Sequence, residues 1–302
     1  MKSVTLLLIL VGTLSISVLA QKSRTKPAAK PKSVVFAVLN DGKLIEPIGY
    51  VTAGKVEQAV DGAAEPVALT SFHRTYYKPA GTYRLIFGGT NAGTVTVKSS
   101  DPKSECTANT AEITFTSPKA RLKGNVMALA TNAATTTKGS GVRRLPTAAE
   151  RSEIEALVRT ELSKQKVSTS AAKDLKYHNL TAMDVDADGT AELIGTYWVD
   201  TSPTSRALLY FIAEKGSDGK YAYGFMDFRH IEQKDVMSSE ISSVDTGIYH
   251  ERLLDVLDID NDGTAEVFTY IQSFEGAGFN AYRRTGGKWA NIYEGSNYHC
   301  GF

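Results

Sequence analysis

Two short acidic stretches hold the residues of this 302-residue chain whose types and spacing best suit metal chemistry. One is Asp-Val-Asp-Ala-Asp-Gly-Thr-Ala-Glu at 184–192, and the other is Asp-Ile-Asp-Asn-Asp-Gly-Thr-Ala-Glu at 258–266. Each puts carboxylates at loop positions one, three, five and nine, with glycine at six. Carboxylates this close repel one another unless a cation lies among them, and Ca²⁺ prefers six to eight oxygen ligands. We therefore expect two calcium sites.

The loops do not match an EF-hand. That motif needs a bidentate glutamate at position twelve and a helix on each side, but position twelve is Gly195 in one copy and Thr269 in the other. The segments that follow, 193–199 and 267–271, are rich in β-branched and aromatic residues, which favour strands. Each loop is therefore expected to join two strands.

The pattern Asp-x-Asp-x-Asp-Gly-x-x-acid between strands resembles the calcium loop of FG-GAP and VCBS-type repeats, which build integrin-like propeller blades. The resemblance implies these calcium ligands: Asp184, Asp186, Asp188 and Glu192, and Asp258, Asp260, Asp262 and Glu266. The chain departs from the family in carrying glutamate, not aspartate, at position nine, and it lacks the Phe-Gly and Gly-Ala-Pro signatures. The resemblance covers the two loops and their flanking strands and leaves the N-terminal half unassigned.

Two further loop positions fit a calcium site. Gly189 and Gly263 stand where the loop must turn sharply, a turn that glycine makes without strain. The main-chain carbonyls of Thr190 and Thr264 would supply the oxygen at position seven. The alternative is an ordinary acidic turn, because Asp and Gly favour turns without any metal. Two copies in matching contexts favour calcium, with bracing of the fold as its expected role.

The two loops lie 74 positions apart, within similar units at about 176–230 and 249–294. Each unit is expected to form a four-stranded meander of the size of a propeller blade. A closed propeller needs at least four blades. Two blades must therefore pack on each other, on a helix or on the N-terminal domain.

One long helix is expected after Pro146, where Thr147 and Glu150 form a capping box. Glu155 and Arg159 can pair on its exposed side. Its apolar stripe at helical spacing consists of Ile154, Leu157, Val158 and Leu162. This stripe is expected to cover one face of the sheet that follows.

Residues 33–131 are expected to form an N-terminal antiparallel β-sandwich or barrel, since short apolar runs alternate with turn signals. The glycine cluster at 88–93 is expected to be a hairpin turn and not a phosphate cradle, because a strand follows it. Tyr76, Tyr77 and Tyr83 fit either a sugar-stacking face or an ordinary core. The fold class is thus mainly β with one long helix, ending in two propeller-blade-like meanders.

The remaining segments suggest export. Residues 1–20 resemble a cleavable signal peptide, and 21–32 form a basic, proline-containing linker. A second linker is expected at 132–145, before a C-terminal domain at 146–302. We expect a secreted or periplasmic protein without a transmembrane segment after cleavage. The only two cysteines, Cys106 and Cys300, either pair or stay free, and export favours a disulfide.

The sequence contains no nucleophile elbow, His-Glu-x-x-His motif or phosphate loop. No catalytic residue is therefore assigned. Surface or core roles are expected for the five scattered histidines: His73, His178, His230, His250 and His299. A formal net charge of +1 argues against nucleic acid as the main partner. The favoured function is a non-catalytic binding or adhesion module of the cell envelope or exterior, with a glycan or surface protein as partner. The alternatives are a secreted hydrolase, or its accessory domain, with structural calcium, and a structural envelope protein with no small ligand.

Overall fold

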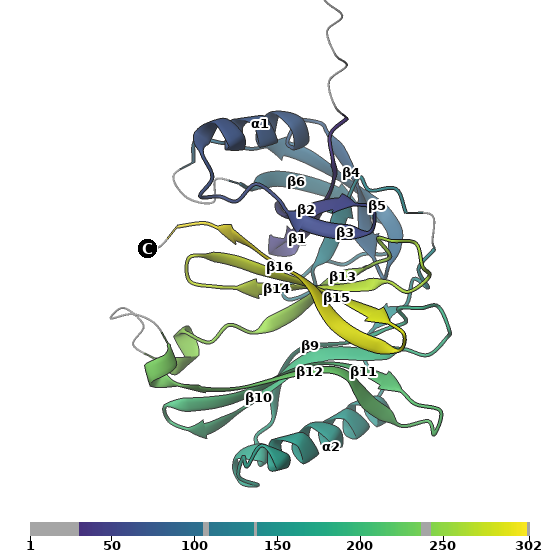
Figure 1. Ribbon diagram of the computed structural model, residues 1–302, viewed down its shortest axis with the longest axis vertical. Helices are drawn as coiled ribbons and strands as arrows, with labels where there is room; N and C mark the ends of the chain where they lie inside the picture. The colour runs from purple at the N-terminus through teal and green to yellow at the C-terminus, as the bar shows by residue number, and fades with distance from the viewer. Residues whose placement is uncertain (1–29, 105–108, 136–137, 237–242, 301–302) are drawn as a thin grey trace, which may run out of the picture. The chain divides into compact units, whose positions relative to one another are not determined.

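The computed structural model describes residues 30–104, 109–135, 138–236 and 243–300. The residues from Lys32 onward form one compact unit. It is mainly β, with three antiparallel sheets and two α-helices among the described residues (Figure 1). The expected signal peptide and most of the basic linker lie outside the described residues. Among those described, no helix has the length and apolar character needed to cross a membrane.

The first sheet is a closed barrel. Its strands are β1 (Ser33–Leu39), β2 (Leu44–Thr52), β3 (Lys55–Gln58), β4 (Thr82–Phe87), β5 (Thr90–Ser99), β6 (Ala111–Thr116) and β7 (Ala128–Thr131). The order β1-β7-β4-β5-β6-β2 closes because β1 also pairs with β2, and β3 extends β2 on the outside. The structure thus selects the barrel from the two architectures expected for this region. The cluster at 88–93 contains the predicted hairpin, with Gly88 and Gly89 between β4 and β5.

The expectation of a single helix is wrong, because α1 (Pro66–Tyr76) packs against the barrel core. Pro66 suits the first helical position, where its missing N–H leaves no bond unmade. Leu69, Phe72 and Tyr76 then recur at helical spacing and are buried. The apolar face of so short a segment is stable as a helix only because the barrel covers it.

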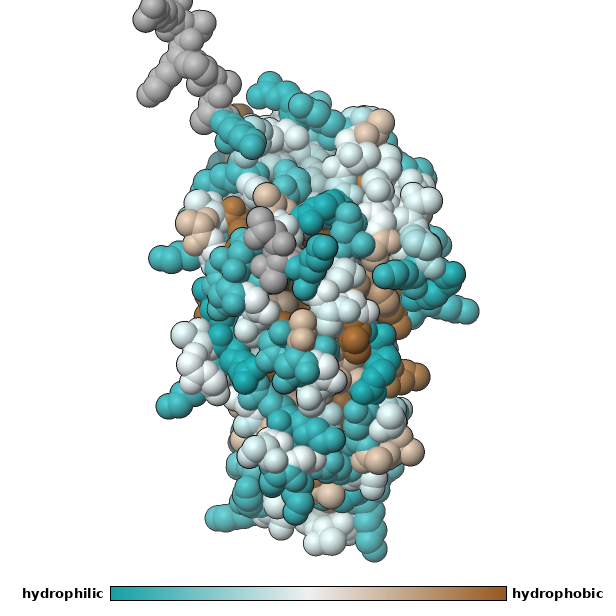
Figure 2. Space-filling model, turned by 90° about the vertical axis from the view of Figure 1, so that its right-hand side faces the viewer, coloured by the Kyte–Doolittle hydropathy of each residue, from teal (hydrophilic) through white to brown (hydrophobic). Residues whose placement is uncertain are grey.

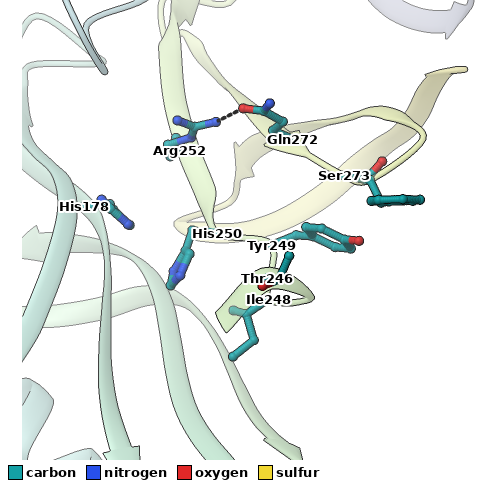
Figure 3. A pocket seen from close by; sticks show the side chains of 9 residues that line it. His178, Thr246, Ile248, Tyr249, His250, Arg252, Gln272 and Ser273 are labelled. Carbon is teal, nitrogen blue, oxygen red and sulfur yellow. Dashed lines mark hydrogen bonds between the residues drawn. The ribbon is translucent and has the colours of Figure 1, made fainter. Parts of the chain in front are cut away.

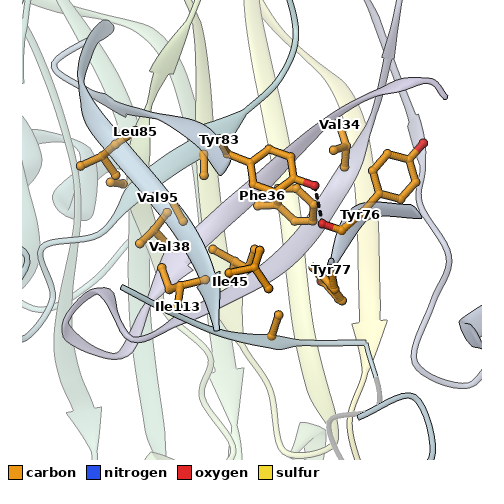
Figure 4. Close-up of a cluster of buried hydrophobic side chains, with 14 of the residues drawn as sticks. Val34, Phe36, Val38, Ile45, Tyr76, Tyr77, Tyr83, Leu85, Val95 and Ile113 are labelled. Atoms are coloured by element: carbon orange, nitrogen blue, oxygen red, sulfur yellow. Dashed lines mark hydrogen bonds between the residues drawn. The ribbon is translucent and has the colours of Figure 1, made fainter. Parts of the chain in front are cut away.

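The tyrosines singled out in the sequence belong to the barrel core. Tyr76, Tyr77 and Tyr83 are all buried, and the hydroxyl of Tyr83 donates a hydrogen bond to the carbonyl of Tyr76 (Figure 4). The ring of Phe36 lies 5.6 Å from that of Tyr77 and 4.9 Å from that of Tyr83. These tyrosines therefore belong to the core and do not form a sugar-stacking face.

The two expected meanders form separate sheets. The second sheet contains β8 (Arg143–Arg144), β9 (Lys176–Met183), β10 (Glu192–Ser202), β11 (Ser205–Lys215) and β12 (Tyr221–Glu232). The third contains β13 (Glu251–Leu257), β14 (Glu266–Gln272), β15 (Gly276–Thr285) and β16 (Lys288–Tyr298). Short 3₁₀ turns lie at Asn40–Gly42, Ala171–Lys173, Gln233–Asp235 and Val244–Thr246. The described residues show no propeller.

Successive hydrophobic cores stack these parts. The outer face of the barrel packs on the third sheet, which packs on the second, whose far face is covered by α2 (Ala148–Lys164) (Figure 1). In β1, Phe36 faces the barrel interior while Val35 and Ala37 face the third sheet. A strand buried on both faces needs apolar residues on both, which explains the continuous apolar run at 34–39. The two meanders thus bury their faces on each other, on a helix and on the barrel.

Helix α2 confirms the sequence prediction. Thr147 and Glu150 form a capping box, and Glu155 pairs with Arg159 at 3.9 Å. Three residues of the predicted stripe are fully buried against the second sheet, and Leu157 is half-buried.

On the face of the molecule shown in Figure 2, hydrophilic residues prevail and hydrophobic ones form mostly small spots.

The predicted disulfide cannot be placed, because Cys106 lies outside the described residues. Asn109 stands three positions after Cys106, and Asn297 stands three positions before Cys300. The side-chain amide of Asn297 donates a hydrogen bond of 3.5 Å to the carbonyl of Asn109. The pairing of Cys106 with Cys300 stays a prediction.

Candidate metal centres

Both acidic loops connect neighbouring antiparallel strands. The first joins β9 to β10, where Met183 pairs with Glu192, and the second joins β13 to β14, where Leu257 pairs with Glu266. The prediction that each loop lies between two strands is confirmed. Gly189 has φ +88° and Gly263 has φ +97°, a left-handed conformation that favours glycine.

The structure brings the three aspartates of each loop together. Asp184, Asp186 and Asp188 each offer a carboxylate oxygen, and these atoms lie within 4.8 Å of one another. The same holds for Asp258, Asp260 and Asp262. Six of the eight carboxylates expected to converge, the aspartates, therefore do so, three in each loop.

The same hydrogen bonds shape both loops. The first aspartate accepts from the glycine N–H, at 3.2 Å for Asp184 and 3.0 Å for Asp258. The carboxylate of the third-position aspartate accepts from the N–H of the fifth-position aspartate, at 3.3 Å in the first loop and 3.2 Å in the second. The carboxylate of the fifth-position aspartate accepts from the threonine N–H, at 2.6 Å in the first loop and 2.8 Å in the second. These bonds hold the carboxylates inward, although similar local bonds also occur in metal-free turns. For Thr190 and Thr264 they involve the N–H groups, and a ligand role of the carbonyls stays a prediction.

The glutamates at position nine lie outside the aspartate clusters. A carboxylate oxygen of Glu192 accepts from the N–H of Val185, and one of Glu266 accepts from the N–H of Ile259, both at 2.9 Å. Burial raises the pKa of Glu192 to about 8 and that of Glu266 to about 7. Each of these carboxyl groups therefore joins the last residue of its loop to the second residue by a hydrogen bond.

Two arginines of β15 reach the loops, and the sequence analysis did not find them. Arg284 donates to Asp186 at 2.7 Å and also pairs with Glu214 at 3.0 Å. Arg283 pairs with Glu266 at 2.5 Å and with Asp260 at 3.3 Å. Adjacent residues of a strand point to opposite faces, so one Arg-Arg pair serves both loops. The sequence held one hint of these arginines, because clustered carboxylates need nearby positive charge and arginine can supply part of it.

One carboxylate oxygen of the first loop has no hydrogen-bond partner among the described residues. This atom is the buried Oδ1 of Asp184, and the residue as a whole is only 6 % exposed. A buried carboxylate oxygen is costly unless something positive or a donor satisfies it. A hard cation held by the three aspartates would do so, and an all-oxygen donor set suits Ca²⁺.

The sequence analysis also missed a pair of histidines. His178 and His250, expected to be scattered, lie with their ring centroids 4.7 Å apart, and both rings contact Trp198.

Comparison with known proteins assigns none of these groups: no family model, no curated protein and no solved structure matches the chain.

Proposed function

We propose that this chain is an exported, non-catalytic binding module whose β-sheets are braced by two calcium ions. The observation that carries the proposal is the pair of three-aspartate clusters at corresponding turns of two stacked sheets. The unpartnered oxygen of Asp184 supports it, because a cation at that point would satisfy a buried carboxylate.

Six aspartates would hold the ions, three in each loop: Asp184, Asp186 and Asp188, and Asp258, Asp260 and Asp262. The glutamates Glu192 and Glu266 and the carbonyls of Thr190 and Thr264 would complete the oxygen set. When bound, the ion would neutralise charge that Arg283 and Arg284 offset only in part.

The loops lie where bracing would matter. The carbonyl of Asp184 accepts a hydrogen bond of 2.7 Å from Ser140, in the segment between barrel and second sheet. Near the second loop, Arg283 donates to the carbonyl of Gly54 at 2.6 Å, in the β2–β3 turn of the barrel. A β-carbon on Gly54 would lie 2.5 Å from that of Asp260, so barrel and loop are in close contact. An ion in each loop would stiffen the junctions among all three sheets.

A binding role is preferred to hydrolysis because the sequence has no recognisable nucleophile or catalytic-metal motif. Export is proposed from the N-terminal sequence, and it fits extracellular calcium modules, which bind at roughly 10⁻⁴–10⁻³ M.

A thermal-shift titration tests the calcium proposal. At about a hundredfold excess over Kd, each site should stabilise the fold by about 2.7 kcal/mol. The melting temperature should rise with calcium and fall with a chelator, and Asp186→Ala or Asp260→Ala should each remove at least about half of the response. Asp218→Ala, in the exposed β11–β12 hairpin, is the matched control. No calcium-dependent shift in the wild-type chain would reduce both loops to ordinary acidic turns.

A further inference from the structure

A pocket of about 300 Å³ lies near the start of strands β9 and β13, at the opposite end from the acidic loops. His178 and Arg252 line it, and each stands six residues before the first aspartate of its loop, roughly 20 Å along the strand. Figure 3 shows His250 beside His178, and Gln272 beside Arg252. This volume is at the lower end of the range for small-molecule sites.

The charge of Arg252 is unbalanced in this pocket. Its guanidinium donates to two neutral amides, Asn125 at 3.0 Å and Gln272 at 3.3 Å, and lies 5.3 Å from the ring centre of Tyr270. No carboxylate of the described residues forms an ion pair with it. Burial without a counterion lowers the pKa of Arg252 from its ordinary value. Arginine in this state favours a planar, bidentate anion.

The neighbouring carboxylates are already engaged. Asp245 pairs with Arg206 at 2.8 Å, and Asp227 pairs with Arg229 at 3.3 Å. Glu251 turns away and accepts hydrogen bonds from side chains of the third sheet: Thr269, Asn280 and Tyr282. Among the described residues that line the pocket, Arg252 thus carries a charge that no ion pair balances.

The two histidines supply neutral polar groups. The Nδ1 atom of His250 is buried and has no hydrogen-bond partner among the described residues. Burial, followed by the charge of a protonated His178, lowers the pKa of His250 to about 4, and burial also lowers the pKa of His178. At neutral pH each ring is therefore uncharged and can donate one hydrogen bond.

We propose that this pocket binds a sugar ring that carries one carboxylate group, such as a uronic acid. The unpaired Arg252 balances one negative charge, which suits a carboxylate better than a phosphate dianion. Tyr249 and the 38 % exposed Phe274 line the pocket and offer apolar faces to the sugar ring. The inference rests on the proposed role as a binding module and is independent of calcium.

Calorimetric titration of the full mature chain tests the pocket, with D-glucuronate as probe and D-glucose, methyl sulfate and inorganic phosphate as comparisons. Glucuronate should bind measurably, glucose should not, and Arg252→Gln should weaken glucuronate binding roughly tenfold or more. Arg159→Gln, on the exposed face of α2, should bind as wild type does. Titrations with calcium and with chelator separate this result from the calcium proposal.

Several outcomes overturn the proposal. They are no glucuronate binding by the wild-type chain, unchanged affinity in Arg252→Gln, and tighter binding of phosphate or methyl sulfate than of glucuronate. If Arg252→Gln does not fold, nitrogen NMR of the wild-type chain gives the answer. The ring signals of His178 and His250 should then shift on adding glucuronate, and unshifted signals refute the site.

Discussion

The backbone N–H of Ala265 donates a hydrogen bond of 2.8 Å to the carbonyl of Val185. Ala265 belongs to the second acidic loop and Val185 to the first, so the two loops are joined directly. The N–H of Val185 is in turn bonded to Glu192 of its own loop. Both residues also lie in the core between the second and third sheets. A change of shape in one loop is therefore expected to reach the other through this bond and the shared core.

Calcium binding at the two loops should be positively coupled. Asp186→Ala removes a proposed ligand of the first loop only, yet it should weaken calcium binding at the second loop roughly fivefold, at the low end of typical coupling energies. Calorimetric titration of the variant measures the remaining site. An affinity at the second loop equal to that in the wild-type chain would show that the bond between Ala265 and Val185 carries no coupling.

Arg284 should compete with calcium at the first loop. It holds Asp186 at 2.7 Å while pairing with Glu214, so a metal bound there must share that carboxylate with a second cation. Arg284→Gln should lower the melting temperature in chelator and tighten calcium binding at this loop. Arg159→Gln serves as control, since its ion pair lies on helix α2. Calcium binding that is weaker in Arg284→Gln than in wild type would contradict the competition.

Asp255 should be among the costliest charged residues to remove. It is fully buried, pairs with the 5 % exposed Arg143 at 2.6 Å, and accepts from the N–H groups of Gly88 and Gly89 at 3.0 and 2.8 Å. These bonds tie the β4–β5 turn of the barrel to β8 and β13. Asp255→Ala leaves a buried arginine unpaired and should destabilise the fold by about 3–5 kcal/mol. Urea unfolding measures this loss, and one below about 1 kcal/mol would refute it.

Glu150 should stabilise the protein in a pH-dependent way. The hydrogen bonds from Arg144 lower its pKa from 4.5 to about 2, so the folded state favours the ionised form. Its contribution is present above pH 4.5 and is lost as the pH falls from 4.5 through 2. Glu150→Gln should therefore be less stable than wild type at pH 7, with the gap closing towards pH 2.

Urea unfolding of both proteins at several pH values checks this prediction. The control is Glu155→Gln, whose partner Arg159 lies at 3.9 Å on the helix surface, where ion pairs contribute little. A difference between wild type and Glu150→Gln that is independent of pH would show that the charge of Glu150 is not responsible.

The sequence by itself determined the features made by residues close together in the chain. The acidic turns, the capping box at Thr147 and Glu150, and the hairpin between β4 and β5 all follow from local hydrogen bonds and backbone preferences. The inward aspartates of each loop belong to this group, because their partners lie within five residues.

Only the tertiary structure decided what distant segments do together. Barrel closure by β1, β2 and β7, helix α1 and the stacking of three sheets depend on apolar surfaces that become neighbours only on folding. The same is true of Arg284 beside Asp186, 98 positions away, and of the pocket between His178 and Arg252. Burial and charge pairing act through space, so their partners cannot be read from local spacing.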